Sequence, residues 1–530
     1  MYAPTLTRRL AGALAALALV AAACGGDDEA TDPPASQAAT ADDSAPPGPD
    51  ATTAAAASAD GAAIVIALGA EPTSLDPHAV DDGGERAIND NVYETLVART
   101  ADGELVGSLA TDLPTQVDEL TWEFDLREDV TFHDGTPFTS DAVVASVDRV
   151  IRLTAESKTD LTFYDTLAGA EAVDERTVRI STTQPDGLLP ARLTWLKIVA
   201  PGAEASDDLS DASNGTGPYR FVAYESGVSV ELAANPDYWG DAPAIDQVSF
   251  AFASEAGTRL AGLKSGQYDL ITNLPPNDVD QAPAYVAIAG QEHPILILDA
   301  DDGITADPDV RLALNLAVDK QAIVDVVYGG FAEIDQGQLL SPSIVGYNDS
   351  LTAYDYDPER AKQLIEEAGV AGQTITLVGE SSGRWLNDGE LVEAIASYWT
   401  EAGLQVDLQT PEFGAYLDIL FDRTNRLDAI FVSSSNDLLD ADRQLSAEYH
   451  MDGSEASNSD AELAALIDEA RVTLDTEARA ELYEQAVAHA YDNAYFVWLV
   501  NNQDIYGLSS ELQFSGRVDG KLLVKEMSLS

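Results

Sequence analysis

One short motif carries the residue types of a hydrolase nucleophile. Residues 379–383 are Gly-Glu-Ser-Ser-Gly, which satisfies the Gly-x-Ser-x-Gly pattern of a strained turn that exposes a serine. An apolar, strand-like stretch precedes the motif, and His450 or His489 would then be the base for Ser381. Residues 384–389 are bulky and polar where such a turn requires a tightly packed helix, and no His-Gly-Gly segment lies upstream to supply an oxyanion hole. We therefore favour a glycine-rich loop over a serine esterase.

A second pairing, His133 with Asp134, has the side chains of a catalytic dyad. Asp134-Gly135 is typical of a turn between a strand and the start of a helix, so we predict a structural role for it. The histidines have no local spacing that would bring several ligands to one metal ion. They are His78, His133, His293, His450 and His489. We accordingly expect no catalytic residue, no metal site and no cofactor.

The N-terminus has the pattern of an export signal with a lipidation site. Two arginines precede an apolar run at 10–23, which is too short to span a bilayer and suits the core of a signal peptide. The run ends in Ala-Ala-Ala-Cys-Gly-Gly at 21–26, which resembles the lipobox of bacterial lipoproteins, although Ala21 stands where leucine is usual. We predict a lipoprotein signal peptide over 1–24, export by the general secretion route, and a lipid anchor on Cys24.

Composition excludes several classes of protein. Residues 25–60 are rich in Ala, Asp, Pro, Ser and Thr and contain no aromatic residue, so we predict a disordered tether. Cys24 is the only cysteine in the chain, which excludes an intrachain disulfide. Acidic residues number 92 against 28 basic ones, a net charge of −64. Such a surface repels phosphate backbones, so we expect a solvated acidic surface and no nucleic-acid binding.

The rest of the chain, 61–530, alternates predicted strands and helices, an order typical of large α/β domains. Apolar or alternating runs predict strands at 63–68, 121–126, 228–232 and 428–432. Helical spacing predicts helices at 141–153, 357–368, 461–474 and 477–491. Ser140 or Thr139 would cap the first of these helices, and Asp357 the second. Pro358 then occupies the first turn of the second helix, and Gly369 ends it.

An ordered set of sequence blocks resembles one known family. The segments WEFDLR at 122–127, VTFHDGTPFT at 130–139 and DAV at 141–143 are similar to the signature of the peptide/nickel-type (family 5) extracellular solute-binding proteins of ABC importers. Further similar blocks are EPTSLDPH (71–78), NVYETL (91–96), GTGPY (215–219), NPDYWG (235–240), RLALNLAVDK (311–320) and YDPERAK (356–362). The blocks follow the family's order, so the resemblance covers roughly residues 62–510.

The resemblance implies a mixed α/β, two-lobed type II periplasmic-binding-protein fold with an extra subdomain in lobe I. A solute would lie between the lobes, and their closure would bury it. The chain would cross between lobes near 296–303 and again near 495–501. The implied ranges are 61–300 plus 496–530 for lobe I, about 97–215 for its inserted subdomain, and 301–495 for lobe II.

The resemblance also implies ligand-binding residues. Asp437 stands where peptide-binding relatives place an aspartate for the peptide amine, although Ser434 replaces their usual tryptophan three residues earlier. Phe413 is similar to a cleft-lining aromatic position, and Arg384 lies close to where dipeptide-binding relatives keep an arginine for a carboxylate. Each also has a structural interpretation. Asp437 would be a loop carboxylate or helix cap, Phe413 a core aromatic and Arg384 a solvated arginine.

Two more positions complete the predicted ligand site. Trp385 would be either a lid aromatic or a packed side chain, and Glu71 matches a glutamate at the edge of the cleft.

The function implied is solute capture rather than catalysis. We expect an extracytoplasmic monomer, anchored to the membrane by the lipid on Cys24, in the periplasm or at the cell surface. It would bind peptides or similar small solutes and pass them to an ABC permease; a nickel complex or an oligosaccharide is the alternative ligand. The chain has no Gly-x4-Gly-Lys phosphate loop, so the importer's ATPase would be a separate protein.

Overall fold

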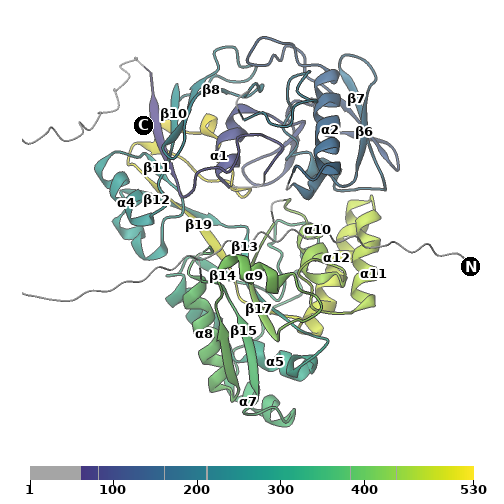
Figure 1. The fold of residues 1–530 in the computed structure, drawn as a ribbon, viewed down its shortest axis with the longest axis vertical. Coiled ribbons are helices and arrows are strands. Elements are labelled where there is room, and N and C mark those ends of the chain that lie inside the picture. Colours follow the sequence, from purple (N-terminus) through teal and green to yellow (C-terminus); the bar gives the residue numbers. More distant parts are fainter. Residues whose placement is uncertain (1–60, 81–82, 160, 211–212, 382–383, 437) are drawn as a thin grey trace, which may run out of the picture. The chain divides into compact units, whose positions relative to one another are not determined.

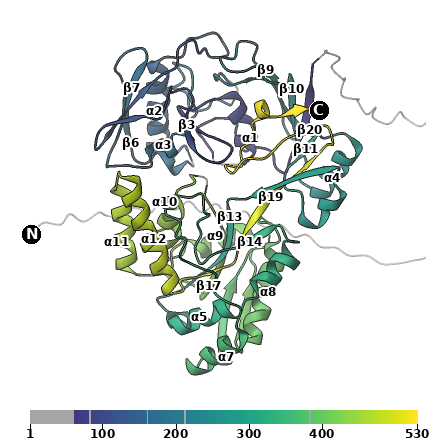
Figure 2. The same cartoon turned by 180° about the vertical axis from the view of Figure 1, so that it is seen from behind.

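The computed structural model describes residues 61–80, 83–159, 161–210, 213–381, 384–436 and 438–530. Three larger β-sheets organise these residues, and helices cover them (Figures 1 and 2). Within the described residues, no helix combines the length and the apolar character needed to cross a bilayer. Cys24 and the predicted signal peptide and tether lie outside this part of the chain.

An eight-stranded sheet begins with the first predicted strand. β1 (Ala63–Leu68) has buried apolar side chains at Ile64, Ile66 and Leu68, and it pairs in parallel with β10 and β11. The sheet order is β12-β19-β11-β1-β10-β9-β8, and β14 also pairs with β19. The bounds of these strands are β8 Tyr219–Glu225, β9 Ser229–Ala234, β10 Gln247–Phe252, β11 Leu270–Ile271, β12 Ala284–Ala289, β14 Ala332–Ile334 and β19 Val500–Leu508.

A four-stranded antiparallel sheet of order β4-β5-β7-β6 has its own core. Its strands are β4 Thr115–Asp118, β5 Thr121–Asp125, β6 Leu167–Ala172 and β7 Thr177–Thr182. Helix α2 (Ser140–Ala155) packs along β6, as Figure 1 shows. The core joins this sheet to the helix and to Trp195, and it also includes Leu438 from a distant part of the chain.

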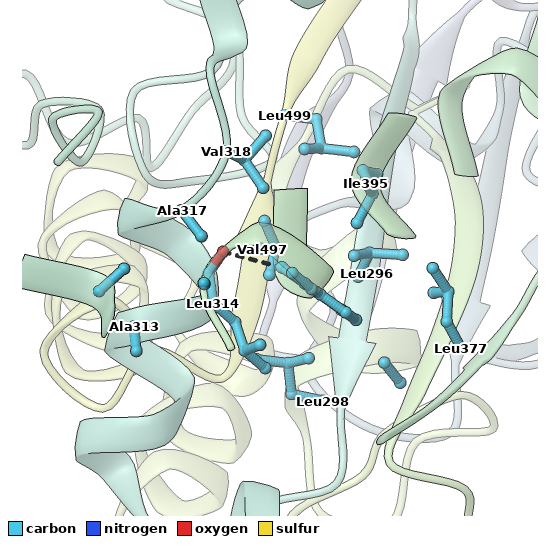
Figure 3. Close-up of a cluster of buried hydrophobic side chains, with 14 of the residues drawn as sticks. Leu296, Leu298, Ala313, Leu314, Ala317, Val318, Leu377, Ile395, Val497 and Leu499 are labelled. Atoms are coloured by element: carbon cyan, nitrogen blue, oxygen red, sulfur yellow. Dashed lines mark hydrogen bonds between the residues drawn. The ribbon is translucent and has the colours of Figure 1, made fainter. Parts of the chain in front are cut away.

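The third sheet is five-stranded, with the order β16-β15-β17-β13-β18. Its strands are β13 Glu292–Leu298, β15 Thr374–Val378, β16 Gln405–Gln409, β17 Ala429–Ser435 and β18 Phe496–Trp498. Helices α5 (Pro308–Leu316), α7 (Pro358–Glu367) and α8 (Asp388–Glu401) share a core with it. Figure 3 shows this core, in which side chains such as Leu296, Leu314 and Val497 come from three different elements.

Two further helices complete the region around the five-stranded sheet. α11 (Ala461–Val472) and α12 (Thr476–Asp492) lie side by side in both views (Figures 1 and 2), as their sequence periodicity predicts. The remaining helices are α1 Gly83–Val92, α3 Leu189–Arg192, α4 Ala256–Ser265, α6 Lys320–Ala322, α9 Phe413–Leu420 and α10 Ala441–Gln444. The remaining strands are β2 Val97–Arg99, β3 Leu105–Gly107, β20 Leu512–Gln513 and β21 Ser528–Leu529.

Two short connections join the eight- and five-stranded sheets, apart from the excursion to β14 between β13 and β15. β12 ends at Ala289 in the first sheet and β13 begins at Glu292 in the second. The return runs from the end of β18 at Trp498 to the start of β19 at Val500. The first passage lies a few residues before 296–303, because the whole of β13 pairs with β17. The lobe ranges drawn from the resemblance stay a prediction.

Candidate functional site

One edge of the five-stranded sheet collects loops from several strands. β15 pairs in parallel with β16 and with β17, so the carboxyl ends of these three strands lie at the same edge. In open α/β sheets ligands bind beyond the carboxyl ends of the strands. The passages to the eight-stranded sheet leave from this edge as well, because β13 begins there and β18 ends there. We call it the C-terminal edge.

Three of the predicted ligand residues meet at the C-terminal edge. Trp385 follows β15 and Phe413 follows β16; their ring centres are 6.2 Å apart in an edge-on arrangement. The guanidinium carbon of Arg384 lies 5.1 Å from the centre of the Phe413 ring, which is cation–π distance. Trp385 also packs edge-on against Tyr416 and Phe431, at 5.8 and 5.6 Å. This packing explains why Trp385 is half-buried, while its contact with a solute stays a prediction.

Glu71 lies elsewhere in the structure. Its Oε1 accepts hydrogen bonds from the Tyr224 hydroxyl (2.5 Å), the Ser226 hydroxyl (3.0 Å) and the backbone N–H of Gly227 (2.8 Å). These partners belong to the hairpin between β8 and β9, and the bonds, led by that from Tyr224, lower the pKa of Glu71. The structure therefore connects Glu71 to this hairpin and does not place it with Arg384, Trp385 and Phe413.

Asp437, the residue predicted to meet a ligand amine, lies outside the described residues. A buried polar network occupies the positions just before it. The Ser434 hydroxyl donates to Glu448 Oε1 at 2.6 Å and accepts from Gln444 Nε2 at 3.2 Å. Asn436 Nδ2 donates to Gln444 Oε1 at 3.0 Å. A small hydroxyl at 434, where relatives usually have an indole, leaves this space to polar side chains.

Glu448 of this network and two further carboxyl groups, Glu455 and Asp388, have raised pKa values that no sequence pattern indicated. Burial, followed by repulsion from Glu455, raises the pKa of Glu448 well above its ordinary value; its Oε2 has no hydrogen-bond partner among the described residues. Burial also raises the pKa of Glu455. Burial, then the hydrogen bond with Glu380, raises the pKa of Asp388 to about 6. In a chain with 92 acidic residues, no sequence signal separates these buried carboxyls from exposed ones.

A cavity of about 420 Å³ lies next to the segment that follows β17. Two distant stretches of the chain line it, residues 163–192 beside the four-stranded sheet and residues 438–471 after β17. Arg192 joins the two stretches, because it lies 3.2 Å from Asp186 and 3.2 Å from Asp442. This volume falls within the ~300–1,000 Å³ range of small-molecule pockets.

Residues 104–456, more than half of the chain, match the family described as bacterial extracellular solute-binding proteins, family 5 (middle). The chain belongs to this family. It is thus an extracytoplasmic solute-binding component of an ABC importer, as the sequence blocks predicted.

Known proteins resemble this solute-binding protein over most of its folded part. Heme-binding protein A of Haemophilus influenzae is 29% identical over 398 residues, 65% of this chain and 69% of the relative. Di/tripeptide-binding protein 1 of Pseudomonas aeruginosa is 27% identical over 452 residues, 76% of this chain and 82% of the relative.

Solved structures confirm the predicted fold. HbpA2 from Haemophilus parasuis matches with a TM-score of 0.78 at 25% identity, covering 88% of this chain and 100% of that structure. The periplasmic binding protein DppA from Helicobacter pylori, in complex with the peptide STSA, matches with a TM-score of 0.71 at 25% identity, covering 88% and 98%. The solute-binding protein therefore has the mixed α/β type II periplasmic-binding-protein fold.

The local structure also bears on the nucleophile motif. After β15 ends at Val378, helix α8 begins only at Asp388, whereas a nucleophile elbow passes directly from strand to helix. Within the described residues, the Ser381 hydroxyl forms no hydrogen bond to a histidine. His489 Nε2 instead lies 2.7 Å from Asp460, and His450 Nε2 lies 3.3 Å from Asp468. This arrangement does not support the esterase hypothesis.

The Phe-His-Asp-Gly segment of the solute-binding protein makes structural contacts. Gly135 has φ +88°, a value that favours glycine, and Asp134 Oδ1 accepts from the backbone N–H of Thr136 at 2.8 Å. His133 Nε2 lies 3.0 Å from the carbonyl oxygen of Gly217. The segment therefore forms a turn that binds the Gly-Thr-Gly-Pro-Tyr block. Among the described residues, no group of three or more His, Cys, Asp or Glu side chains is arranged to hold a metal ion.

Proposed function

We propose that this solute-binding protein captures short peptides or similar amine-bearing solutes and delivers them intact to its permease. The observation that carries the proposal is the recurrence of peptide-binding proteins among the relatives, beside heme- and nickel-binding ones: glutathione-, dipeptide- and di/tripeptide-binding proteins match at 27–30% identity, and one structural match holds the peptide STSA. Glu380, which follows β15, and Asp388, at the start of α8, share a hydrogen bond, and this pair supports a ligand with a positive charge. An ammonium that leaves water requires a fixed opposite charge nearby.

In this proposal the protein binds without breaking a covalent bond and acts as a monomer. Lobe I would comprise 61–300 and 496–530, with the inserted subdomain at about 97–215, and lobe II would comprise 301–495. Arg384, Trp385 and Phe413 would line the closed cleft near the C-terminal edge, and Asp437 would meet the ligand amine. Glu71 would contact the ligand only at the margin of the cleft, since its carboxylate already has three donors.

A thermal-shift screen tests the proposal directly. The panel would contain peptides of two to nine residues, single amino acids, heme, nickel–histidine and oligosaccharides. A ligand that binds only the folded state adds about 2.7 kcal/mol of stability at a concentration of 100 Kd. We expect a peptide to raise the melting temperature, and Asp437→Asn to reduce that rise.

Two results would contradict the proposal. If peptides of every length fail and heme, a nickel complex or an oligosaccharide succeeds, the ligand class is wrong while the family and fold stand. If a bound peptide is returned in cleaved form, and Ser381→Ala abolishes cleavage, the protein is an enzyme.

We also propose that Cys24 carries the lipid anchor and that residues 25–60 connect it to the folded part. The support is the lipobox-like segment at 21–26, at the end of an apolar run with signal-peptide length. Cys24→Ser should abolish incorporation of labelled palmitate in the producing cell and move the protein from the membrane fraction to the soluble one. Wild-type levels of label in Cys24→Ser would refute the anchor without affecting the proposed ligand.

A further inference from the structure

The cavity between residues 163–192 and 438–471 is strongly charged. Four aspartates and three arginines line it: Asp165, Asp186, Asp442 and Asp452, with Arg192, Arg443 and Arg471. Most of these charges neutralise one another. Arg192 lies 3.2 Å from both Asp186 and Asp442, and Arg471 Nε lies 3.1 Å from Asp442.

Arg443 is the exception among the three arginines. Within the described residues its side chain forms no hydrogen bond and no ion pair, and its Nε is buried without a partner. Partial burial of a guanidinium that has no hydrogen-bond acceptor costs free energy. Binding of an anion by the arginine would offset this cost. It is also unusual in a protein where acidic residues outnumber basic ones by 92 to 28.

Two glutamates near Arg443 do not supply that anion. Glu448 and Glu455 are close enough for the arginine's charge to act on both, yet neither forms an ion pair with it. Burial raises the pKa of each glutamate, and the Ser434 hydroxyl already occupies Glu448 Oε1. The charge of Arg443 is therefore left for a group that enters the cavity.

We propose that Arg443 binds the carboxylate of a zwitterionic ligand, the C-terminal carboxylate of a peptide. This inference rests on the proposed function and adds that the carboxylate of the ligand is bound in this cavity. The planar fork of a guanidinium matches the two oxygens of a carboxylate. Asp165 and Asp452 are exposed carboxylates lining the same cavity, so a ligand with only negative charge is disfavoured and one that also carries an ammonium is accepted.

A comparison of a peptide with its C-terminally amidated form tests the inference. Isothermal titration would use the wild type, Arg443→Gln, Arg443→Lys and the control Arg360→Gln on the exposed face of α7. Arg384→Gln would be measured as well, because Arg384 is the alternative partner for the carboxylate. In the wild type, amidation should weaken binding about tenfold or more, as expected for loss of a charged hydrogen bond. Arg443→Gln should weaken binding of the free-acid peptide by the same factor and show no further loss on amidation. Arg443→Lys should retain part of the discrimination, and Arg360→Gln should discriminate as the wild type does.

Three outcomes would overturn the inference. The first is an Arg443→Gln variant that binds both peptide forms as tightly as the wild type does. The second is a variant that weakens both peptide forms equally, which would make Arg443 a structural counter-charge for Glu448 and Glu455. The third is a loss of discrimination in Arg384→Gln alone, which would assign the carboxylate to the C-terminal edge. If neither peptide form binds the wild type, the proposed function fails, and the inference fails with it; the other three outcomes leave that function standing.

Discussion

Glu448 is the residue at which burial and charge conflict most clearly. Its carboxyl group is buried, accepts one hydrogen bond from Ser434 and has a pKa raised by burial and by Glu455. An acid whose folded-state pKa exceeds its unfolded value stabilises the protein at low pH and loses that contribution as the pH rises. We expect Glu448→Gln, which keeps an acceptor for Ser434 but cannot ionise, to become more stable relative to the wild type as the pH rises above about 4.3, the ordinary pKa of a glutamate.

Urea unfolding at several pH values measures this difference, and Glu469→Gln on the exposed face of α11 is the matched control. Wild-type and Glu448→Gln stabilities that change in parallel with pH would show that Glu448 ionises freely in the folded protein.

Only some residues of the candidate site could be predicted from the sequence. The family resemblance pointed to Arg384, Trp385 and Phe413, and the structure brings these three together. The same resemblance offered Glu71, whose partners lie in a hairpin some 150 residues away in sequence. No sequence pattern indicated Arg443 or Glu448, because their burial depends on contacts among distant segments.

Helix α7 shows how local side-chain chemistry determines where a helix begins. The Asp357 side chain accepts a hydrogen bond from the backbone N–H of Arg360 at 2.9 Å, and Pro358 occupies the first turn. Loss of such a cap costs about 1 kcal/mol. We expect Asp357→Ala to lower the free energy of unfolding by this amount, measured by urea denaturation.

Thr139 provides the control, since it precedes α2 but its side chain makes no capping hydrogen bond. Thr139→Ala should change stability by less than about 0.5 kcal/mol. An equal loss of unfolding free energy in both variants would mean that the capping hydrogen bond of Asp357 makes no specific contribution to stability.

Elements with strong local signals were the predictable part of the fold. β1, α7 and the α11–α12 pair match their predicted positions to within a few residues, because apolar periodicity and caps act over short distances. The place where β13 joins its sheet was less predictable. Its apolar run of buried residues fits either sheet, and only pairing with β17 and β18 decides between them.

At the scale of the whole molecule, distant chain segments of a type II binding fold converge on one charged region. The C-terminal edge of the five-stranded sheet provides aromatic rings and buried carboxyls, and the adjoining cavity provides Arg443. Reversible capture needs opposite charges held in place before the ligand arrives, so that closing the protein does not leave an ion unpaired. The sequence blocks predicted this fold through family resemblance, whereas the ion pairs between Arg192 and its two aspartates became visible only in the structure.

The most direct measurement is an isothermal titration with the peptide that gives the largest thermal shift, followed by mass spectrometry of the recovered ligand. We expect saturable binding of one peptide per chain and recovery of the peptide with its mass unchanged. Continued heat release after saturation together with cleaved peptide, or no binding by any peptide, would contradict this expectation.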